Sequence, residues 1–418
     1  MPGVGTTDRG IVGSRTVVVG ASVGGTKTVQ ALRSQGYAGE LLVVEAEPHL
    51  PYDKPPLSKG YLTGTLGRDR LNLVSDAEIK DLAVGVKLGV RAKSLDVAAN
   101  ELALEDGERI AFDNLIVASG VRARPSPWQA KDGVHLLRTL DDAEMLKKNL
   151  QNSRSVVVVG GGFIGAEVAA AARHFGLDVS IVDPLEVPIG RVLGDPVGKL
   201  FTRLHHLNDV ATHFGNGVEA ITGTKGNLTV ELTDGKLLSC DLVVVGIGAV
   251  PNTEWLASSG LLIENGLVCD EYCRADGQAN IFGVGDVARW YHPRQRELVR
   301  VEHWTNAVEQ AACVAHNITN PKDLTRYAPV PYVWSDQYDW KIQIAGETAR
   351  ASDYVVVEDP SNENRFAAVY ADHSGLFCGV ATVNWPRAMI QCRRLLDSEN
   401  AISIPLNLLN DLLPGRPG

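Results

Sequence analysis

"RSVVVVGGGFIGAEVAAAARHFG" (residues 154–176) decides the fold of this chain. Four consecutive valines lead into a glycine turn, and the turn leads into a segment whose apolar residues have helical spacing. A second β-branched run, "DVSIVDP" (178–184), follows directly. Because buried parallel strands have continuous apolar sequences, the pattern predicts a strand–helix–strand unit with parallel strands.

The glycines of this turn match the dinucleotide pattern G-x-G-x-x-G at Gly160, Gly162 and Gly165. The first allows a tight turn, the second lets a pyrophosphate approach the backbone, and the third lets helix and strand pack closely. Free N–H groups at the helix start would then face the phosphates. Asp183 ends the next strand, where a carboxylate accepts hydrogen bonds from a ribose 2′-hydroxyl and repels a 2′-phosphate. We therefore predict a dinucleotide site that prefers NADH to NADPH.

An earlier stretch repeats the pattern with one change. "RTVVVGASVGGTKTVQALRSQG" (15–36) is followed by the strand-like "ELLVVEAE" (40–47). Gly20 and Gly25 occupy the first and third glycine positions, whereas Ser22 occupies the second. Serine is small enough for a phosphate to approach, although less closely than with glycine.

Two neighbours support a second nucleotide site here. Gly24 adds a glycine beside the third position, and Glu45 ends the following strand. The two units resemble each other and begin far apart in the chain, so we predict two nucleotide-binding domains.

Composition limits the other possibilities. The 418 residues suffice for two or three domains, and 44% hydrophobic with 22% charged content is typical of a soluble globular protein. A net charge of −10 argues against a general nucleic-acid partner. We expect no membrane association, since no run of about 18 apolar residues occurs, and residues 1–14 have the character of a disordered tail without a signal-peptide core. We expect a cytoplasmic protein.

The cysteines point to neither a redox site nor a metal site. None precedes residue 240 and none forms C-x-x-C, so we predict scattered buried thiols and no bound metal. The six are Cys240, Cys269, Cys273, Cys313, Cys378 and Cys392.

The character of the chain changes after Tyr327. Segments such as "VPYVWSDQYDWKIQIAGE" (330–347) are typical of antiparallel strands, and "PRAMIQCRRLLDSE" (386–399) of a helix. A third, α+β domain is therefore expected at the C-terminal end.

Three further segments make the interpretation specific: "PYDKPPLSKGYL" (51–62), "NIFGVGDVARW" (280–290) and "EHWTNAVEQAA" (302–312). Together with the two glycine turns, and in this order, they resemble the FAD-dependent ferredoxin reductases of the oxygenase-coupled type, the group of putidaredoxin reductase and of the reductase component of biphenyl dioxygenase. The resemblance extends from about residue 15 to about residue 410.

The resemblance implies a glutathione reductase-like α/β flavoprotein with two Rossmann-type dinucleotide-binding domains and a C-terminal α+β interface domain. The FAD-binding domain is expected to be discontinuous, with the NAD-binding domain inserted into it. The implied boundaries are 15–121 with 241–326 for FAD, 122–240 for NAD and 327–418 for the C-terminal domain.

The resemblance also implies site residues. Asp286 would bind the ribityl chain, Trp304 would lie against the isoalloxazine, and Arg138 would contact FAD. The backbone of Ala46 and Ala92 would contact the adenosine end. The complete FAD set is Gly20, Ser22, Gly24, Gly25, Glu45, Ala46, Lys59, Ala92, Arg138, Asp286 and Trp304. Glu47 could take over the ribose contact of Glu45, and that choice stays open.

The implied NAD set is Gly160, Gly162, Gly165, Glu167, Asp183, Gly246 and Gly248. Within it, Glu167 resembles the glutamate that pairs with the lysine near flavin N5, here Lys59. The resemblance makes these two the catalytic pair. The alternative for Glu167 is an acid that merely favours the first turn of a helix.

The implied reaction passes electrons from NADH through FAD to a 2Fe–2S ferredoxin that serves a cytochrome P450 or a Rieske-type oxygenase. A disulfide-type relative would need a redox cysteine near the flavin, and residues 48–66 contain none. A binding module like apoptosis-inducing factor would be expected to carry a presequence, an anchor or a basic surface. Whether the protein is a monomer or a homodimer stays open.

A ferredoxin of this kind is typically acidic, so a local basic face is expected. The candidates are Arg289, Arg294, Arg296, Arg300, Lys341, Arg387, Arg393 and Arg394.

Overall fold

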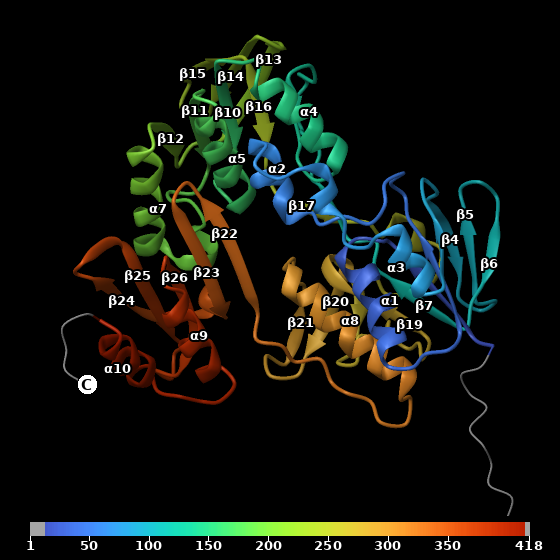
Figure 1. Cartoon of the computed structure of the whole chain (residues 1–418). Coiled ribbons are helices and arrows are strands. Elements are labelled where there is room, and N and C mark those ends of the chain that lie inside the picture. The colour runs from blue at the N-terminus through green and yellow to red at the C-terminus, as the bar shows by residue number, and fades with distance from the viewer. Residues whose placement is uncertain (1–12, 414–418) are drawn as a thin grey trace, which may run out of the picture. The chain divides into compact units, whose positions relative to one another are not determined.

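A computed structural model describes residues 13–413 of the chain (Figure 1). The chain divides into two compact units. The first takes the chain up to Asp53, then Arg68–Arg122 and Ala249–Pro329. The second takes Lys54–Gly67, Ala123–Gly248 and the chain from Val330 onward. Residues 1–12 of the predicted tail lie outside the described residues.

A five-stranded parallel sheet forms the centre of the first unit, in the order β19-β7-β1-β2-β3. Its strands are β1 (Arg15–Val19), β2 (Glu40–Val44), β3 (Val84–Lys87), β7 (Asn114–Val117) and β19 (Ile281–Gly283). The valines of β1 are buried, as expected for a strand covered on both faces. Helices α1 (Val23–Ser34) and α8 (Trp304–Thr319) pack side by side (Figure 1). The predicted strand–helix–strand unit is thus confirmed.

Smaller elements complete the first unit. Two three-stranded sheets lie beside the parallel one, with the orders β4-β5-β6 and β18-β20-β21. The remaining elements are α3 (Asp76–Asp81), β4 (Ala92–Asp96), β5 (Glu101–Leu104), β6 (Arg109–Ala111), β17 (Ala249–Pro251), β18 (Leu267–Cys269), β20 (Ala288–His292), β21 (Glu297–Val299) and the short 3-10 helices η2 (Arg68–Leu71), η3 (Glu254–Leu256) and η4 (Gly285–Val287). Strand β8 (Val121–Ala123) begins where this unit ends.

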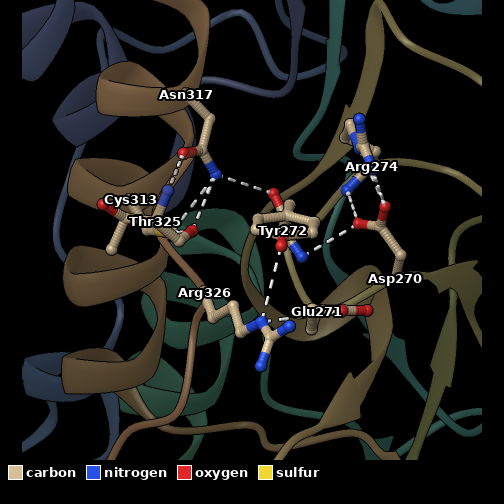
Figure 2. A network of polar contacts seen from close by, with 8 residues as sticks. All are labelled: Asp270, Glu271, Tyr272, Arg274, Cys313, Asn317, Thr325 and Arg326. Atoms are coloured by element: carbon tan, nitrogen blue, oxygen red, sulfur yellow. Dashed lines mark hydrogen bonds and ion pairs between the residues drawn. The ribbon is translucent and has the colours of Figure 1, made fainter. Parts of the chain in front are cut away.

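A polar network holds the late part of this unit together (Figure 2). The side-chain amide of Asn317, on α8, donates to the carbonyls of Tyr272 and Thr325 at 3.1 and 3.0 Å. Asp270 accepts from the N–H groups of Tyr272 and Arg274, both at 2.9 Å, and pairs with the Arg274 guanidinium at 2.7 Å. These contacts fix the loop after β18 to α8.

The second unit contains another parallel sheet, in the order β12-β11-β10-β16-β9. A three-stranded antiparallel sheet, β13-β14-β15, shares an apolar core with it. The strands are β9 (Val134–His135), β10 (Ser155–Val159), β11 (Asp178–Asp183), β12 (Val210–Phe214), β13 (Val218–Thr224), β14 (Asn227–Leu232), β15 (Leu237–Cys240) and β16 (Leu242–Val245). The helices are α4 (Leu140–Leu150) and α5 (Phe163–His174).

Two segments belong to a different unit from the domain that the sequence analysis assigned them to. Strand β16 pairs in parallel with β10, so the chain stays in the second sheet beyond the expected boundary at residue 240. The segment Lys54–Gly67, with η1 (Pro55–Ser58) and α2 (Gly60–Thr63), also packs in the second unit. There the Lys147 ammonium lies 5.1 Å from the ring centroid of Tyr61. A short apolar strand or loop carries no sign of which sheet it will join, because its partners are distant in sequence.

The C-terminal part of the second unit is an antiparallel sheet, in the order β22-β23-β26-β25-β24, which confirms the predicted α+β character. One apolar core joins it to α6 (Gly190–Leu193) and α7 (Asp195–Leu207). Another joins it to α9 (Pro386–Leu395) and α10 (Ser403–Asp411). The strands are β22 (Tyr332–Gln337), β23 (Trp340–Gly346), β24 (Asp353–Asp359), β25 (Asn362–Ala371) and β26 (Phe377–Val383), with η5 (Thr348–Arg350) between β23 and β24.

All six cysteines are free thiols, and only Cys378 is not buried. Residues 13–413 contain no cluster of three or more histidine, cysteine or acidic residues that could hold a metal ion. Over the same range, no helix combines the length and the apolar character that crossing a membrane requires.

Candidate functional site: two glycine turns and a buried ion pair

The first glycine turn joins β1 to α1. Gly20 has φ +104°, a conformation that side chains rarely adopt, and a Cβ atom there would overlap the Ala118 carbonyl. A Cβ atom at Gly25 would overlap the Gly20 carbonyl. Ser22 is the extended residue before the helix, and its side chain makes no capping hydrogen bond. With no acidic residue in the first turn of α1, the helix start offers N–H groups and partial positive charge to an anion.

The second glycine turn, between β10 and α5, has the same geometry. Gly160 has φ +113°, and a Cβ atom there would overlap the Gly246 carbonyl. A Cβ atom at Gly165 would overlap the Gly160 carbonyl, and Gly162 takes the extended place before the helix. The first turn of α5 also lacks acidic residues. The structure thus brings Gly246, a predicted nucleotide residue, directly beside this turn.

Each turn is fastened by the acid that ends the next strand. Glu45 accepts from the N–H groups of Ala21 and Glu47, at 2.5 and 2.9 Å. Glu47 is itself engaged, because its carboxylate accepts from the Tyr52 hydroxyl at 2.5 Å. Glu45 is therefore the acid that lies against the first turn, and its remaining lone pairs can accept from a ribose.

Asp183 repeats this arrangement in the second turn. Its two carboxylate oxygens accept from the N–H groups of Gly161 and Leu185, at 2.6 and 2.8 Å. The bond to Gly161 ties the carboxylate to the glycine turn, and the bond to Leu185 fixes it to the chain that follows the strand. Gly248, with φ +100°, comes shortly after β16, and its carbonyl accepts from the Arg124 N–H at 2.9 Å.

The late segment "GVGDVA" returns beside the first turn. A Cβ atom at Gly24 would lie 3.1 Å from Val284 Cγ1, so the start of α1 touches the chain that leads to Asp286. The N–H group of Gly285 donates to the Gln310 side chain at 2.8 Å, and the Asp286 carbonyl accepts from Arg300 at 3.2 Å. Asp286 is therefore carried on a turn fixed by α8 and by the segment before it.

The start of α8 adds two side chains to the first unit. The Trp304 indole donates to Asp53 at 2.9 Å, so this half-buried ring is fixed by a polar partner. Burial lowers the pKa of His303 to about 4, against an opposing effect of the Asp286 charge. His303 Nδ1 is buried and has no hydrogen-bond partner within residues 13–413. A neutral histidine with an unpartnered ring nitrogen suits a site whose remaining partner is a ligand; the sequence analysis did not single it out.

The predicted pair Lys59–Glu167 forms in the second unit. Lys59 Nζ donates to the Glu167 carboxylate at 2.8 Å; the lysine side chain is 17% exposed and the glutamate 2%. The same carboxylate accepts from the hydroxyls of Ser58 and Ser335. Helix α5 begins at Phe163, so Glu167 lies past the first turn and the alternative of a first-turn acid is wrong. Neither serine is predicted from the sequence as part of this site.

The other predicted positions are distributed between the units. Ala46 follows Glu45, and Ala92 begins β4, both in the first unit. Arg138 precedes α4 in the second unit, where its backbone N–H donates to Asp142 at 3.1 Å. Of the predicted FAD residues, Lys59 and Arg138 thus belong to the second unit and the rest to the first.

The predicted basic residues fall into paired and unpaired ones. Arg289 and Arg300 each form an ion pair with a glutamate 2.6 Å away. Arg387 and Arg394 are exposed on α9, one helical face, with the 57% exposed Ile390 between them. No ion pair engages either arginine in the described part of the chain. The face of α9 is therefore one candidate with free positive charge; Arg296 and Lys341 are likewise exposed without an ion pair among residues 13–413.

Comparisons with known proteins agree with this geometry. Residues 14–311 match the family model "Pyridine nucleotide-disulphide oxidoreductase", and residues 332–411 match "Reductase C-terminal". Rhodocoxin reductase of Rhodococcus erythropolis is 38% identical over 92% of this chain and 89% of its own. The ferredoxin–NAD(+) reductase component of the anthranilate 1,2-dioxygenase system of Burkholderia cepacia is 36% identical over 91% of this chain and 93% of its own.

Among solved structures, the covalent putidaredoxin reductase–putidaredoxin complex matches with a TM-score of 0.87. That match has 29% sequence identity and covers 92% of this chain and 93% of the other.

Proposed function

Because the chain belongs to the pyridine nucleotide-disulphide oxidoreductase family, we propose that it is an NADH-dependent flavoprotein reductase. It passes electrons from NADH through FAD to a 2Fe–2S ferredoxin, which supplies a cytochrome P450 or a Rieske-type oxygenase. The two relatives described above, which are 38% and 36% identical over almost the whole chain, are reductases of such systems. The observation that carries the proposal is the pair of matching glycine turns in a chain whose residues 48–66 contain no cysteine.

The first unit is proposed to hold FAD and the second NADH. At each turn, the glycine conformations, the acid-free helix start and the fastened carboxylate suit a dinucleotide pyrophosphate with its ribose. The orphaned Nδ1 of His303 beside Asp286 supports a ligand in the first unit. When bound, FAD accepts a hydride and releases electrons singly, a conversion that no side chain provides.

The residues themselves bind, orient and fix charge. Asp183 would accept from the NADH ribose and disfavour the extra phosphate of NADPH. Glu167 orients Lys59 through a short ion pair. We propose that Lys59 and Glu167 are the catalytic pair, with Lys59 supplying positive charge that stabilises reduced flavin. Asp286, Trp304 and the backbone of Ala46 and Ala92 are proposed FAD contacts, as is Arg138.

A disulfide reductase is not favoured. That chemistry needs a thiol pair beside the flavin, and no cysteine occurs before residue 240. A pure binding module is not favoured either, because the relatives over almost the whole chain are reductase components.

A flavin titration tests the function. Anaerobic NADH is expected to bleach the flavin absorbance of the purified protein, and NADPH to do so much more slowly. A protein without flavin, or one that NADPH bleaches faster, would overturn the proposal.

The exposed face of α9, with Arg387 and Arg394, is the proposed docking surface for the ferredoxin. Free charges at an interface rim mainly raise the encounter rate, and salt screens them over about 8 Å at physiological ionic strength. Raising the salt concentration should therefore slow ferredoxin reduction markedly and leave ferricyanide reduction nearly constant. Replacing Arg387 and Arg394 with glutamine should remove most of that salt dependence, whereas replacing the paired Arg289 should not. Equal salt responses for both acceptors would contradict electrostatic docking.

We further propose that the enzyme works in the cytoplasm, where NADH is available and free thiols stay reduced.

A further inference from the structure

The carboxylate of Glu167 is held by more than its lysine. It is almost completely buried, and three segments of the second unit meet at it: the end of η1, helix α5 and strand β22. One oxygen, Oε2, accepts from Lys59 at 2.8 Å and from the Ser58 hydroxyl. The other, Oε1, accepts from the Ser335 hydroxyl at 2.6 Å. Both oxygens thus have donors, but only Ser335 binds the oxygen that faces away from the lysine.

Ser335 is itself fixed by strand geometry. Side chains alternate along β22, so Ser335 and Gln337 share one face and Trp334 lies on the other. Ser335 and Gln337 are fully buried. The Gln337 amide donates to the Ser335 oxygen at 3.3 Å, which leaves the serine proton free to point at the carboxylate. A chain of hydrogen bonds therefore runs from Gln337 through Ser335 to Glu167.

We propose that Ser335 is a positioning residue: by binding Oε1 it orients the Glu167 carboxylate so that Oε2 faces Lys59. A buried carboxylate deprived of one donor must turn or draw in water to satisfy the exposed lone pairs. Either response weakens the ion pair to Lys59. The effect on electron transfer rests on the proposed function of Lys59 and Glu167, whereas the effect on the ion pair does not.

The first measurement concerns the ion pair alone. Lys59 is partly exposed, so acetic anhydride can acetylate it, and peptide mass spectrometry gives the rate for this residue in the folded flavoprotein. Ser335→Ala should raise that rate roughly 10-fold, the effect of losing a hydrogen bond to a charged group. Glu167→Gln marks the fully broken pair, and Ser335→Thr, which keeps a hydroxyl, should restore slow labelling.

Thr382 offers a matched control in the same sheet. It is fully buried on β26, and its hydroxyl has no hydrogen-bond partner in the described part of the chain. Thr382→Val removes a buried hydroxyl without breaking a bond and should leave Lys59 labelling unchanged. If Ser335→Ala labels no faster than Thr382→Val, the positioning role is overturned.

The second measurement is the rate of flavin reduction by NADH, followed in single-turnover mixing. Ser335→Ala should slow it roughly 10-fold and move the pH profile, and the loss should vanish when Glu167 is already glutamine. If Ser335→Ala slows flavin reduction equally in the Glu167→Gln background, the positioning role is overturned. The effect of the serine would then not act through the Glu167 carboxylate. If Lys59→Met and Glu167→Gln both leave the rate unchanged, the proposed catalytic pair fails, while the labelling result still decides the role of Ser335.

Discussion

The two glycine turns are near copies in backbone and differ in sequence. At the first position, Gly20 and Gly160 both have φ above +100°. A Cβ atom at either would overlap a carbonyl of the adjacent strand ending, that of Ala118 or that of Gly246. At the third position, a Cβ atom in either turn would overlap the carbonyl of the turn's own first glycine. The fold itself therefore requires glycine at the first and third positions of both turns.

The second position is different. Ser22 has φ −67° and ψ −166°, and Gly162 has φ −77° and ψ −177°, which any residue can adopt. A Cβ atom at Gly162 would meet no atom within 4 Å. The fold thus tolerates serine there, and glycine can matter only for what approaches the turn from outside. Serine at the second position of the first turn therefore bears on how closely a ligand approaches and not on folding.

The residue before the third glycine also differs. Gly24 lies against Val284, because the late segment returns over this turn, whereas its counterpart Ile164 is 45% exposed. In the sequence, Gly24 counted as support for a nucleotide site because it stands beside the third glycine. The structure supplies a packing reason: a chain segment more than two hundred residues later takes the space of a side chain.

The largest effects are expected at the third glycines. In Gly165→Ala, the new methyl group overlaps the Gly160 carbonyl oxygen. The backbone at either residue can move away only by disrupting β10 or α5. We expect a loss of about 3 kcal/mol or more in unfolding free energy and loss of NADH binding. Denaturant unfolding and NADH titration measure both. Gly25→Ala should do the same to the first turn and release FAD.

Gly162→Ala is the control for this prediction, since its new methyl group meets no protein atom within 4 Å. Its unfolding midpoint should match that of the parent. An equal loss at Gly162 and Gly165 would show that the two positions do not differ as the backbone geometry implies.

An intermediate effect on nucleotide binding is expected at Asp183 and Glu45, the acids that accept hydrogen bonds from the two turns. In Asp183→Asn, one acceptor oxygen becomes an amide donor that faces a backbone N–H group, so one of two hydrogen bonds is lost. The KM for NADH should rise about 10-fold, equivalent to about 1.4 kcal/mol, and the preference over NADPH should fall. Glu45→Gln should weaken FAD retention and leave the NADH preference intact. If Asp183→Asn still rejects NADPH as strongly as the parent, the preference arises elsewhere.

A feature could be predicted from the sequence when its contacting residues lie close together along the chain. Both turns, their parallel strands and their acids follow from local patterns, because strand, glycine and carboxylate lie within one short unit. Ser335 could not be found this way: its partner Glu167 is distant in sequence, and a serine in a strand has no special pattern. Only the folded chain shows that Glu45 binds the backbone of the first turn and that Glu47 binds the Tyr52 hydroxyl. The pairing of Lys59 with Glu167 came from resemblance, and the structure supplies its geometry.

The smallest effect is expected from exchanging the residues at the second position. Gly162→Ser gives the second turn the serine of the first, and Ser22→Gly does the reverse. Both should change unfolding free energy by no more than about 0.5 kcal/mol, because a Cβ atom at Gly162 meets no atom within 4 Å and the Ser22 hydroxyl makes no capping hydrogen bond. Gly162→Ser should raise the KM for NADH a few-fold, since the hydroxymethyl group meets the pyrophosphate. Ser22→Gly should retain FAD as the parent does, because the first turn already accommodates serine. A large gain in FAD affinity for Ser22→Gly, measured by dilution and flavin fluorescence, would mean that the serine holds the cofactor back and that the two turns differ in how closely a phosphate approaches them.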